Sequence, residues 1–332
     1  MRSTTDPAPA PVRRGVWIFP SAPAGALVEA VLTAERLGLD ELWLGDEGPA
    51  RDPFTVLAAA AVRTSRIRLG VAITNPYLRH PMALATHAMT VDELSGGRMV
   101  LGLGPGGHVA LGPAGVPRTQ PLTRVRDALR TVRAVAHGRA DAGYAPPAGA
   151  FTRPGLRIVV GSRSRGFQEL ASREADGVFL GGIPEPVLAQ TVGWARSVRP
   201  VDVTVYGTTA VGDDVERVRP QLVMSLADSP AHVHEALDLD RTQVVAAASA
   251  LAAGDPGPAR RLVRDDVLET LVLHGPPEQV AERLAGWLVH RPSSVGLSVT
   301  TDDPVRAVEE AAAALAVFDR RRAQEGGSTR CA

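Results

Sequence analysis

Short apolar segments alternate with longer amphipathic segments along the chain from Gly15 onward. The short segments have the length and composition of buried strands. They predict eight strands, at residues 15–19, 41–45, 67–73, 99–104, 156–161, 177–181, 201–206 and 295–300. The longer segments have helical periodicity, and two of them end at glycines, Gly38 and the pair Gly96 and Gly97. Glycine is common just after a helix, so these positions predict helix ends.

Strands that alternate with helices pair in parallel, and eight such units predict a closed (β/α)₈ TIM barrel of the α/β class. An open doubly wound sheet is the structural alternative. We expect one barrel domain at residues 13–318, a disordered N-terminus at 1–12 and a flexible C-terminal tail at 319–332. A Pro/Gly-rich loop at 139–155 and a mostly helical stretch between residues 206 and 295 are expected to be insertions.

The stretch "SGGRMVLGLGPGG" at residues 95–107 contains the spacing G-x-G-x-x-G, which is found in dinucleotide-binding folds. Such a site needs a helix that begins inside the glycine motif. Here glycines and prolines interrupt any helix until about Leu122. We therefore interpret Gly104, Pro105, Gly106 and Gly107 as a strand-to-loop junction that leaves room for a flat ring or a chain of phosphates.

Composition narrows the possible chemistry. The chain has no lysine, so all 36 basic residues are arginines, which excludes Schiff-base aldolases, pyridoxal-phosphate enzymes and P-loop nucleotide binders. The formal net charge is +0, which favours neither nucleic acid nor a membrane surface as a partner. The single cysteine, Cys331, excludes an internal disulfide framework and zinc sites built on several thiolates. No long apolar run or apolar leader is present, so we expect a cytoplasmic protein.

The active site of such a barrel lies at the carboxyl ends of its strands. After the fifth predicted strand, "GSRSRG" at residues 161–166 opens directly into a helix. The N–H groups of a helix N-terminus bind anions. The sequence therefore predicts a phosphate site made of Gly161, Ser162, Arg163, Ser164 and Arg165; a solvent-facing turn is the alternative.

Asp46 and Glu47 follow the second predicted strand and are candidates for acid–base catalysis. Neighbouring strand residues face opposite sides, so we expect only one of the two to face the barrel mouth. Asp52 is expected to cap the helix that begins at Pro53. Arg98 precedes its strand and is expected to form a structural ion pair at the opposite end of the barrel.

The histidines are weaker candidates for a catalytic or metal-binding role. His80 and His108 lie in predicted rim loops and are weak candidates for proton transfer. His232 and His234 are two apart in a helical stretch, a spacing that does not put them on one face, so we expect no metal site there.

The stretch "TSRIRLGVAITNPYLRHPMALATHAMTVDELSGGRMVLGLGPG" at residues 64–106 resembles a signature of the bacterial luciferase-like superfamily. It is most similar to the branch of deazaflavin-dependent oxidoreductases that resemble methylene-tetrahydromethanopterin reductase. "LGLDELWLGDE" and "ELASREADGVFLGG" match two further blocks, and the likeness runs from about Gly15 to Leu315.

This resemblance implies a barrel, commonly a homodimer, that holds coenzyme F420 or FMN across the strand ends. It implies a non-prolyl cis peptide between Ala72 and Ile73 in a bulge under the coenzyme ring, with Thr74 and Asn75 following in the same coenzyme-binding set. The phosphate loop of the family matches "GSRSRG". The implied lining of the coenzyme tail is Gly181 and Gly182.

The implied activity is hydride transfer between the deazaflavin and a C=C, C=N or C=O group of a small-molecule substrate, with Asp46 or Glu47 as proton shuttle. An FMN-dependent monooxygenase and a coenzyme-binding barrel without catalysis are the alternatives. Two positions depart from the family pattern. Glu47 stands where many deazaflavin members have histidine, and Gly107 stands where they often have an acidic residue. The substrate is expected to be set by the loops at 107–121 and 139–155 and by the helical insertion.

Overall fold

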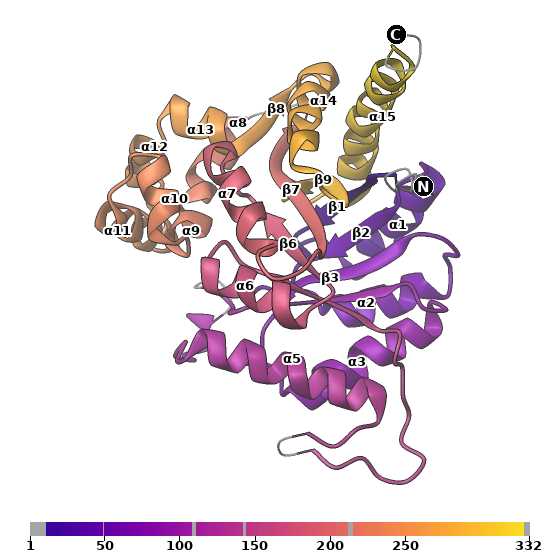
Figure 1. Ribbon diagram of the computed structural model, residues 1–332. Coiled ribbons are helices and arrows are strands. Elements are labelled where there is room, and N and C mark those ends of the chain that lie inside the picture. The colour runs from indigo at the N-terminus through magenta and orange to yellow at the C-terminus, as the bar shows by residue number, and fades with distance from the viewer. Residues whose placement is uncertain (1–10, 49, 108–110, 142–143, 212–214, 329–332) are drawn as a thin grey trace, which may run out of the picture.

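Eight parallel strands close into a barrel in the computed structural model of the chain, which describes residues 11–48, 50–107, 111–141, 144–211 and 215–328 (Figure 1). The barrel strands are β1 (Arg13–Ile18), β2 (Glu41–Leu44), β3 (Arg68–Thr74), β4 (Met99–Leu103), β5 (Arg157–Gly161), β6 (Gly177–Gly181), β7 (Asp202–Val211) and β9 (Ser294–Val299). Each overlaps one predicted strand. Pairing of β7 with β9 and of β9 with β1 closes the ring, which confirms the TIM barrel and excludes the open sheet.

One short strand was not predicted. Strand β8 (Val272–Gly275) pairs in parallel with the carboxyl-terminal end of β7, where Thr208 lies opposite Val272. It follows helix α13 (Asp265–Leu271) without a break, so the apolar run that contains it has the pattern of one continuous helix. A four-residue strand of this kind carries no periodicity of its own.

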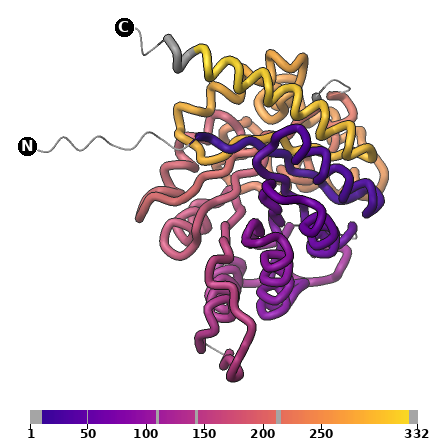
Figure 2. The backbone as a smooth tube through the Cα atoms, turned by 90° about the vertical axis from the view of Figure 1, so that its right-hand side faces the viewer, coloured from indigo at the N-terminus to yellow at the C-terminus, as the bar shows by residue number. Residues whose placement is uncertain are grey.

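Helices pack around the outside of the barrel (Figures 1 and 2). They are α1 (Ala24–Arg36), α2 (Pro53–Ala61), α3 (Pro81–Leu94), α5 (Pro121–His137), α6 (Arg165–Glu174), α7 (Glu185–Ala195), α14 (Pro277–Gly286) and α15 (Pro304–Ser328). The expected ends are confirmed: Gly38 follows α1 at φ +77°, and Gly96 follows α3 at φ +67°. The Asp52 side chain caps α2 by accepting a hydrogen bond from the Thr55 amide at 2.7 Å.

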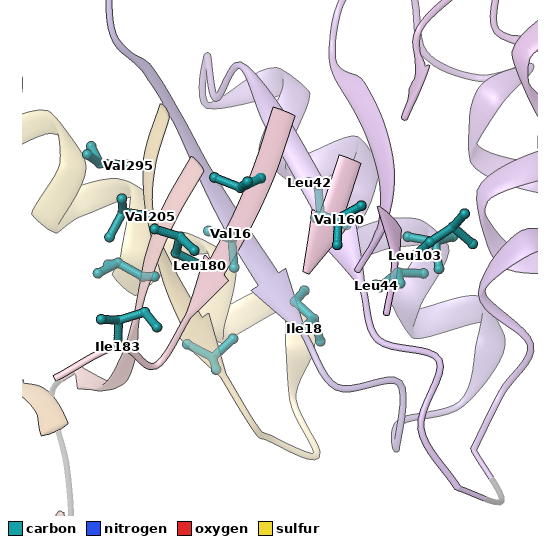
Figure 3. Close-up of a cluster of buried hydrophobic side chains, with 14 of the residues drawn as sticks. Val16, Ile18, Leu42, Leu44, Leu103, Val160, Leu180, Ile183, Val205 and Val295 are labelled. Atoms are coloured by element: carbon teal, nitrogen blue, oxygen red, sulfur yellow. The ribbon is translucent and has the colours of Figure 1, made fainter. Parts of the chain in front are cut away.

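Alternate strand residues serve two different cores. The outward residues are aliphatic and pack against the helices; Figure 3 labels Val16, Ile18, Leu42, Leu44, Leu103, Val160, Leu180, Val205 and Val295, together with Ile183 from the loop after β6. The inward residues form a separate cluster around three aromatic side chains, Trp43, Phe179 and Tyr206. Phe179 stands between the other two, with ring centroids 5.0 Å from Trp43 and 5.1 Å from Tyr206. Aromatic side chains therefore fill the middle of the barrel.

A buried carboxylate lies below these rings. The Glu41 side chain is 1% exposed. Its Oε1 accepts hydrogen bonds from Trp43 Nε1 at 3.0 Å, the Tyr206 hydroxyl at 2.9 Å and the Ser294 hydroxyl at 2.5 Å. Its Oε2 pairs with Arg13 Nε at 3.1 Å. This set of contacts satisfies a charge that would otherwise be costly to bury.

The stretch between β7 and β9 forms a helical insertion on one side of the barrel (Figure 1). It contains α8 (Val215–Val218), a 3₁₀ turn (Arg219–Gln221), α9 (Leu222–Ala227), α10 (Ala231–Ala236), α11 (Arg241–Ala252), α12 (Gly257–Leu262) and α13. Arg219 joins the start of the insertion to its end. The Arg219 guanidinium contacts Glu216 at 2.6 Å and Asp265 at 2.8 Å.

The loop at 139–155 does not border the mouth, contrary to our expectation that it helps select the substrate. It leads from the end of α5 to the start of β5, so it lies at the amino-terminal end of the strands, and it projects from the body of the protein (Figure 2). Arg153 fixes its base through an ion pair with the buried Asp92 at 2.7 Å. Arg98 lies at this same end, but it donates mainly to carbonyls, such as Ile67 O at 2.8 Å, rather than to a carboxylate.

Helix α15 continues to Ser328, although residues from 319 onward were expected to be a flexible tail. Two ion pairs hold the extra turns. Asp319 pairs with Arg14 of β1, and Arg321 lies 3.6 Å from Glu282 of α14. Alanine, arginine and glutamate also favour helix, so a polar composition here does not imply disorder. None of the helices in the described ranges is both long and apolar enough to cross a bilayer.

The Glu41 network makes a prediction about stability. Replacement of Glu41 by Gln removes the buried carboxylate that pairs with Arg13 Nε, leaves Arg13 only its longer contact with Asp202 at 3.5 Å, and brings an amide donor toward existing donors. We expect Glu41→Gln to lower the free energy of unfolding by about 3 kcal/mol, as measured by denaturant titration. Glu29→Gln is the matched control, because Glu29 forms an exposed pair with Arg63 and should cost about 0.5 kcal/mol or less. Equal losses in the two variants would contradict the structural role of Glu41.

Candidate functional site

The barrel mouth is shaped by a bulge at the end of β3. The peptide bond between Ala72 and Ile73 is cis, as expected from the family resemblance. The register between β3 and β4 shifts between Val71 and Thr74, so the bulge lies at this bond. The Trp17 indole donates a hydrogen bond to the Ala72 carbonyl from β1. The bulge is thus supported across the barrel.

The Ile73 side chain fills the space that glycines leave on the two following strands. A Cβ on Gly104 would lie 2.0 Å from Ile73 Cδ1, and a Cβ on Gly161 would lie 2.3 Å from Ile73 Cγ2. Both distances are far below van der Waals contact. Neither position accepts a side chain while Ile73 stays where it is, and the three residues together form an apolar floor.

Two buried polar residues follow Ile73. The Thr74 side chain is 0% exposed, and its hydroxyl has no hydrogen-bond partner among the described residues. The side-chain oxygen of Asn75 accepts from the amides of Tyr77 at 3.1 Å and Leu78 at 3.0 Å, which fixes the loop after β3. Buried hydroxyl groups are normally hydrogen-bonded. A ligand bound beside Thr74 would give its hydroxyl a partner.

The loop after β5 presents N–H groups at its helix. Helix α6 begins at Arg165, so the first amides of the helix have no acceptor within it. The Ser164 side chain makes no capping hydrogen bond to the helix. The buried Gln168 donates to the Ser162 carbonyl and holds the loop from behind. These donors suit the predicted phosphate site.

The two arginines of this loop are engaged elsewhere. Arg165 forms an exposed pair with Glu169 at 2.7 Å. Arg163 points across the mouth, where its Nε donates to the Gly181 carbonyl at 3.1 Å. Both guanidinium groups thus have protein partners in this structure, which leaves the amides and the serine hydroxyls as the loop's available donors for an anion.

Gly181 and Gly182 lie at the end of β6 beside this arginine. Gly182 has φ +58° and donates its amide to the Tyr206 carbonyl at 2.9 Å. A Cβ on Gly182 would lie 3.1 Å from Arg163 Nη2 and 3.3 Å from the Thr208 hydroxyl. The pair borders the mouth, but Arg163 occupies part of the space next to it.

Asp46 and Glu47 both lie beyond the end of β2 at Leu44, so the expectation from strand alternation stays a prediction, but the two carboxylates have different partners. Both carboxylate oxygens of Asp46 accept from Arg79, at 3.0 and 3.1 Å, and the same guanidinium reaches Asp52 at 2.7 Å. Asp46 is therefore committed to a rim ion pair. Glu47 interacts instead with the charges of Arg163 and of Asp228, a residue of the insertion.

The Glu47 carboxyl has a raised pKa. Loss of solvent around it in the mouth is the largest cause; Asp228 and Asp46 raise the pKa further, while Arg163 opposes them. Desolvation likewise lowers the pKa of the Arg163 guanidinium. A carboxyl that keeps its proton above its ordinary pKa range is suited to donate that proton.

Sequence reasoning missed two residues of the mouth. Arg118 donates to the Gly106 carbonyl at 2.9 Å and to Asp228 at 3.2 Å. Both residues lie in segments without a readable motif, a Pro/Gly-rich loop and the helical insertion. His80 caps α3 by accepting from the Met82 amide at 3.2 Å, and His108 lies outside the described residues.

Metal chemistry finds no support in the part of the chain that is described. It holds no group of three or more histidine, cysteine, aspartate or glutamate side chains placed to bind an ion. His234 instead contacts the Leu226 carbonyl at 2.8 Å through its Nε2.

The chain is similar to a number of known proteins, and two relatives and one solved structure illustrate the likeness. The 5,10-methylenetetrahydromethanopterin reductase of Methanolobus tindarius is 28% identical over 289 residues, which cover 81% of this chain and 89% of that protein. A putative coenzyme F420-dependent oxidoreductase of Mycobacterium tuberculosis is 40% identical over 108 residues, 32% of this chain and 31% of that protein.

The solved structure is the coenzyme F420-dependent tetrahydromethanopterin reductase from Methanopyrus kandleri. It superposes with a TM-score of 0.78 at 24% identity, over 91% of this chain and 98% of that one, which supports the fold. The family model described as luciferase-like monooxygenase matches residues 8–291, most of the chain and every element of the mouth described above. The chain therefore belongs to the luciferase-like monooxygenase family.

Proposed function

We propose that this protein is a coenzyme F420-dependent oxidoreductase that transfers a hydride between the deazaflavin and a small organic substrate. The observation that carries the proposal is the apolar floor of Ile73 between Gly104 and Gly161, a surface for a flat ring. The relatives with F420 in their names or titles support the choice of coenzyme. A homodimer and a cytoplasmic location stay predictions from the sequence.

The residues at the mouth suit such a coenzyme. Ala72, Ile73 and the glycines at 104, 106 and 107 would hold the ring, and the unpaired Thr74 hydroxyl would gain a partner there. Ser162, Ser164 and the first amides of α6 would hold the phosphate. The bound deazaflavin would supply hydride chemistry at a ring carbon.

The residues of the chain would exclude water from the site and would also supply a proton. Aromatic side chains close the barrel below the floor, and the insertion borders the mouth above it. Glu47 would donate the proton, because desolvation raises the pKa of its carboxyl, whereas Asp46 is engaged by Arg79. In the reverse direction the Glu47 carboxylate accepts the proton.

Coenzyme preference tests the proposal. Fluorescence titration of the purified protein with oxidised F420 and, in parallel, with FMN should give micromolar binding of F420 and much weaker binding of FMN. The reverse preference would contradict the proposal and favour an FMN-dependent monooxygenase. Tight F420 binding without turnover across a broad panel of reducible acceptors would favour a coenzyme-binding barrel without catalysis.

The same titration locates the site. Gly161→Ala pushes a methyl group into Ile73 and should weaken F420 binding about tenfold or more, since one disrupted contact surface of this size costs about 1.4 kcal/mol. Gly193→Ala is the control, because a Cβ there meets nothing within 4 Å. Thermal unfolding verifies that both variants are folded. Unchanged affinity in folded Gly161→Ala would place the coenzyme elsewhere.

The role of Glu47 is tested by substitution. Glu47→Gln should lower turnover about 100-fold or more, the usual loss for a general acid, with coenzyme affinity nearly unchanged. Turnover of the wild type should decline as the pH rises through the raised pKa of Glu47, and the variant should lack this dependence. Equal turnover in the two proteins would remove Glu47 from the mechanism.

The raised pKa also predicts a pH effect on stability. The folded protein binds the Glu47 proton more tightly than the unfolded chain does. This contribution to stability is therefore complete below the ordinary pKa of 4.5 and is lost as the pH rises through the folded-state pKa. Glu47→Gln should accordingly gain unfolding free energy relative to wild type between acidic and neutral pH, whereas Glu29→Gln should not.

A further inference from the structure

Four charged residues lie at the amino-terminal end of the barrel, opposite the mouth. Arg13, Arg68, Arg157 and Asp202 are the first residues of β1, β3, β5 and β7. Inward residues of alternate strands form layers inside a barrel of this kind. We call these four residues the basal layer.

Strand alternation directs the side chains of the basal layer into the barrel, because residues two positions apart on a strand face the same side. Arg68 stands two residues before Gly70, where a Cβ would lie 2.1 Å from the ring of Trp43 in the inner cluster. Arg157 stands two residues before Val159, which belongs to the same cluster. The arginines therefore approach one another below the aromatic side chains.

One aspartate serves two of the three arginines. Asp202 Oδ2 lies 2.7 Å from Arg157 Nη2 and 3.5 Å from Arg13 Nη2. Arg13 also pairs through its Nε with the buried Glu41 at 3.1 Å. The guanidinium groups of Arg13 and Arg157 thus meet at a single carboxylate oxygen, although each guanidinium carries five N–H donors.

The donors of the basal layer outnumber its acceptors. Arg157 Nε is buried and has no hydrogen-bond partner among the described residues. Arg68 lies opposite Glu41 in the register of β3 and β2, yet it forms no ion pair within the described ranges. Three guanidinium groups face only two carboxylates, those of Glu41 and Asp202, so one positive charge is in excess.

The pKa of the Arg68 guanidinium reflects this excess of positive charge. Loss of solvent is the largest cause of its lowered pKa, and the charges of Arg13 and Arg157 lower it further, while Glu41 and Asp202 act in the opposite direction. A bound anion would offset the repulsion among the arginines.

We propose that the basal layer binds a phosphate group, either as inorganic phosphate or as part of a small phosphate monoester. Phosphate offers oxygens in several directions, and arginine binds it with paired, charge-assisted hydrogen bonds. The layer is open to solvent, since the side chains of Arg157 and Asp202 are 40% and 34% exposed. Arg68 and the Nε of Arg157 supply the donors. This site lies at the opposite end of the barrel from the loop before α6, and the proposal does not depend on the coenzyme.

Thermal unfolding in increasing inorganic phosphate tests the proposal, at fixed pH and with sodium chloride added to keep the ionic strength constant. A ligand of the folded state raises the unfolding temperature once its concentration exceeds its Kd. In Arg68→Gln this rise should need about tenfold more phosphate or beyond, because a charge-assisted contact is lost. No rise in the wild type, or an equal rise in the two proteins, would overturn the proposal; the second result would place the phosphate elsewhere, such as at α6.

The same experiment separates an anion site from a structural role of Arg68. Without phosphate, Arg68→Gln should unfold at a higher temperature than the wild type, because the variant removes one of three crowded positive charges. A lower temperature would contradict the repulsion on which the proposal rests. Arg63→Gln is the matched control, since it removes an arginine of an exposed pair with Glu29 and should respond to phosphate as the wild type does.

A second variant examines Arg157. Arg157→Lys keeps a positive charge that can pair with Asp202 but has no Nε donor, so it should stay folded and bind phosphate more weakly in isothermal titration calorimetry. Wild-type phosphate affinity in both Arg157→Lys and Arg68→Gln would refute the assignment.

Glycerol 2-phosphate distinguishes the two sources of the phosphate group. Stabilisation by this monoester that is lost in Arg68→Gln would support a phosphorylated metabolite as the ligand. Stabilisation by inorganic phosphate alone, again dependent on Arg68, would support the free ion. Stabilisation of the wild type by neither compound would contradict the proposal.

Discussion

Packing of one isoleucine against two glycines determines the shape of the barrel mouth. Ile73 leaves the bulge of β3 and fills the space over Gly104 of the β4 loop and Gly161 of β5. The bulge is held from below by the Trp17 indole, and the aromatic cluster under it is anchored on the buried Glu41. The result is an apolar floor that rests on the aromatic cluster of the barrel interior, with polar donors at its edges. The proposed coenzyme site depends on that floor.

The floor and the proposed acid both come from the barrel. Its strands and the loops that follow them supply Ile73, Gly104, Gly161 and Glu47, and the insertion supplies Asp228 beside Gly107. Arg163 joins the two parts, because it contacts Gly181 on one side and the segment from Ser225 to Ser229 on the other.

The sequence predicted the features that depend on local pattern. Eight barrel strands, the Asp52 cap, the terminal glycines of α1 and α3 and the N-terminus of α6 all follow from periodicity or from the conformational preferences of single residues. It failed where an element has no pattern of its own, as in β8, which continues the apolar run of α13.

Long-range contacts were also beyond sequence reasoning. The partners of Arg163 and the place of Asp228 depend on how the insertion folds back on the barrel, and no local pattern encodes that. The 139–155 loop was misjudged because its role depends on which end of the barrel it joins, and its connection from α5 to β5 decides that point.

A crystal structure of the protein with oxidised F420 tests the central claim most directly. The account predicts the deazaflavin ring against Ile73 and Gly104, the phosphate at Ser162, Ser164 and the first amides of α6, and a partner for the Thr74 hydroxyl. Coenzyme bound away from Ile73, or a phosphate held at another loop, would contradict it.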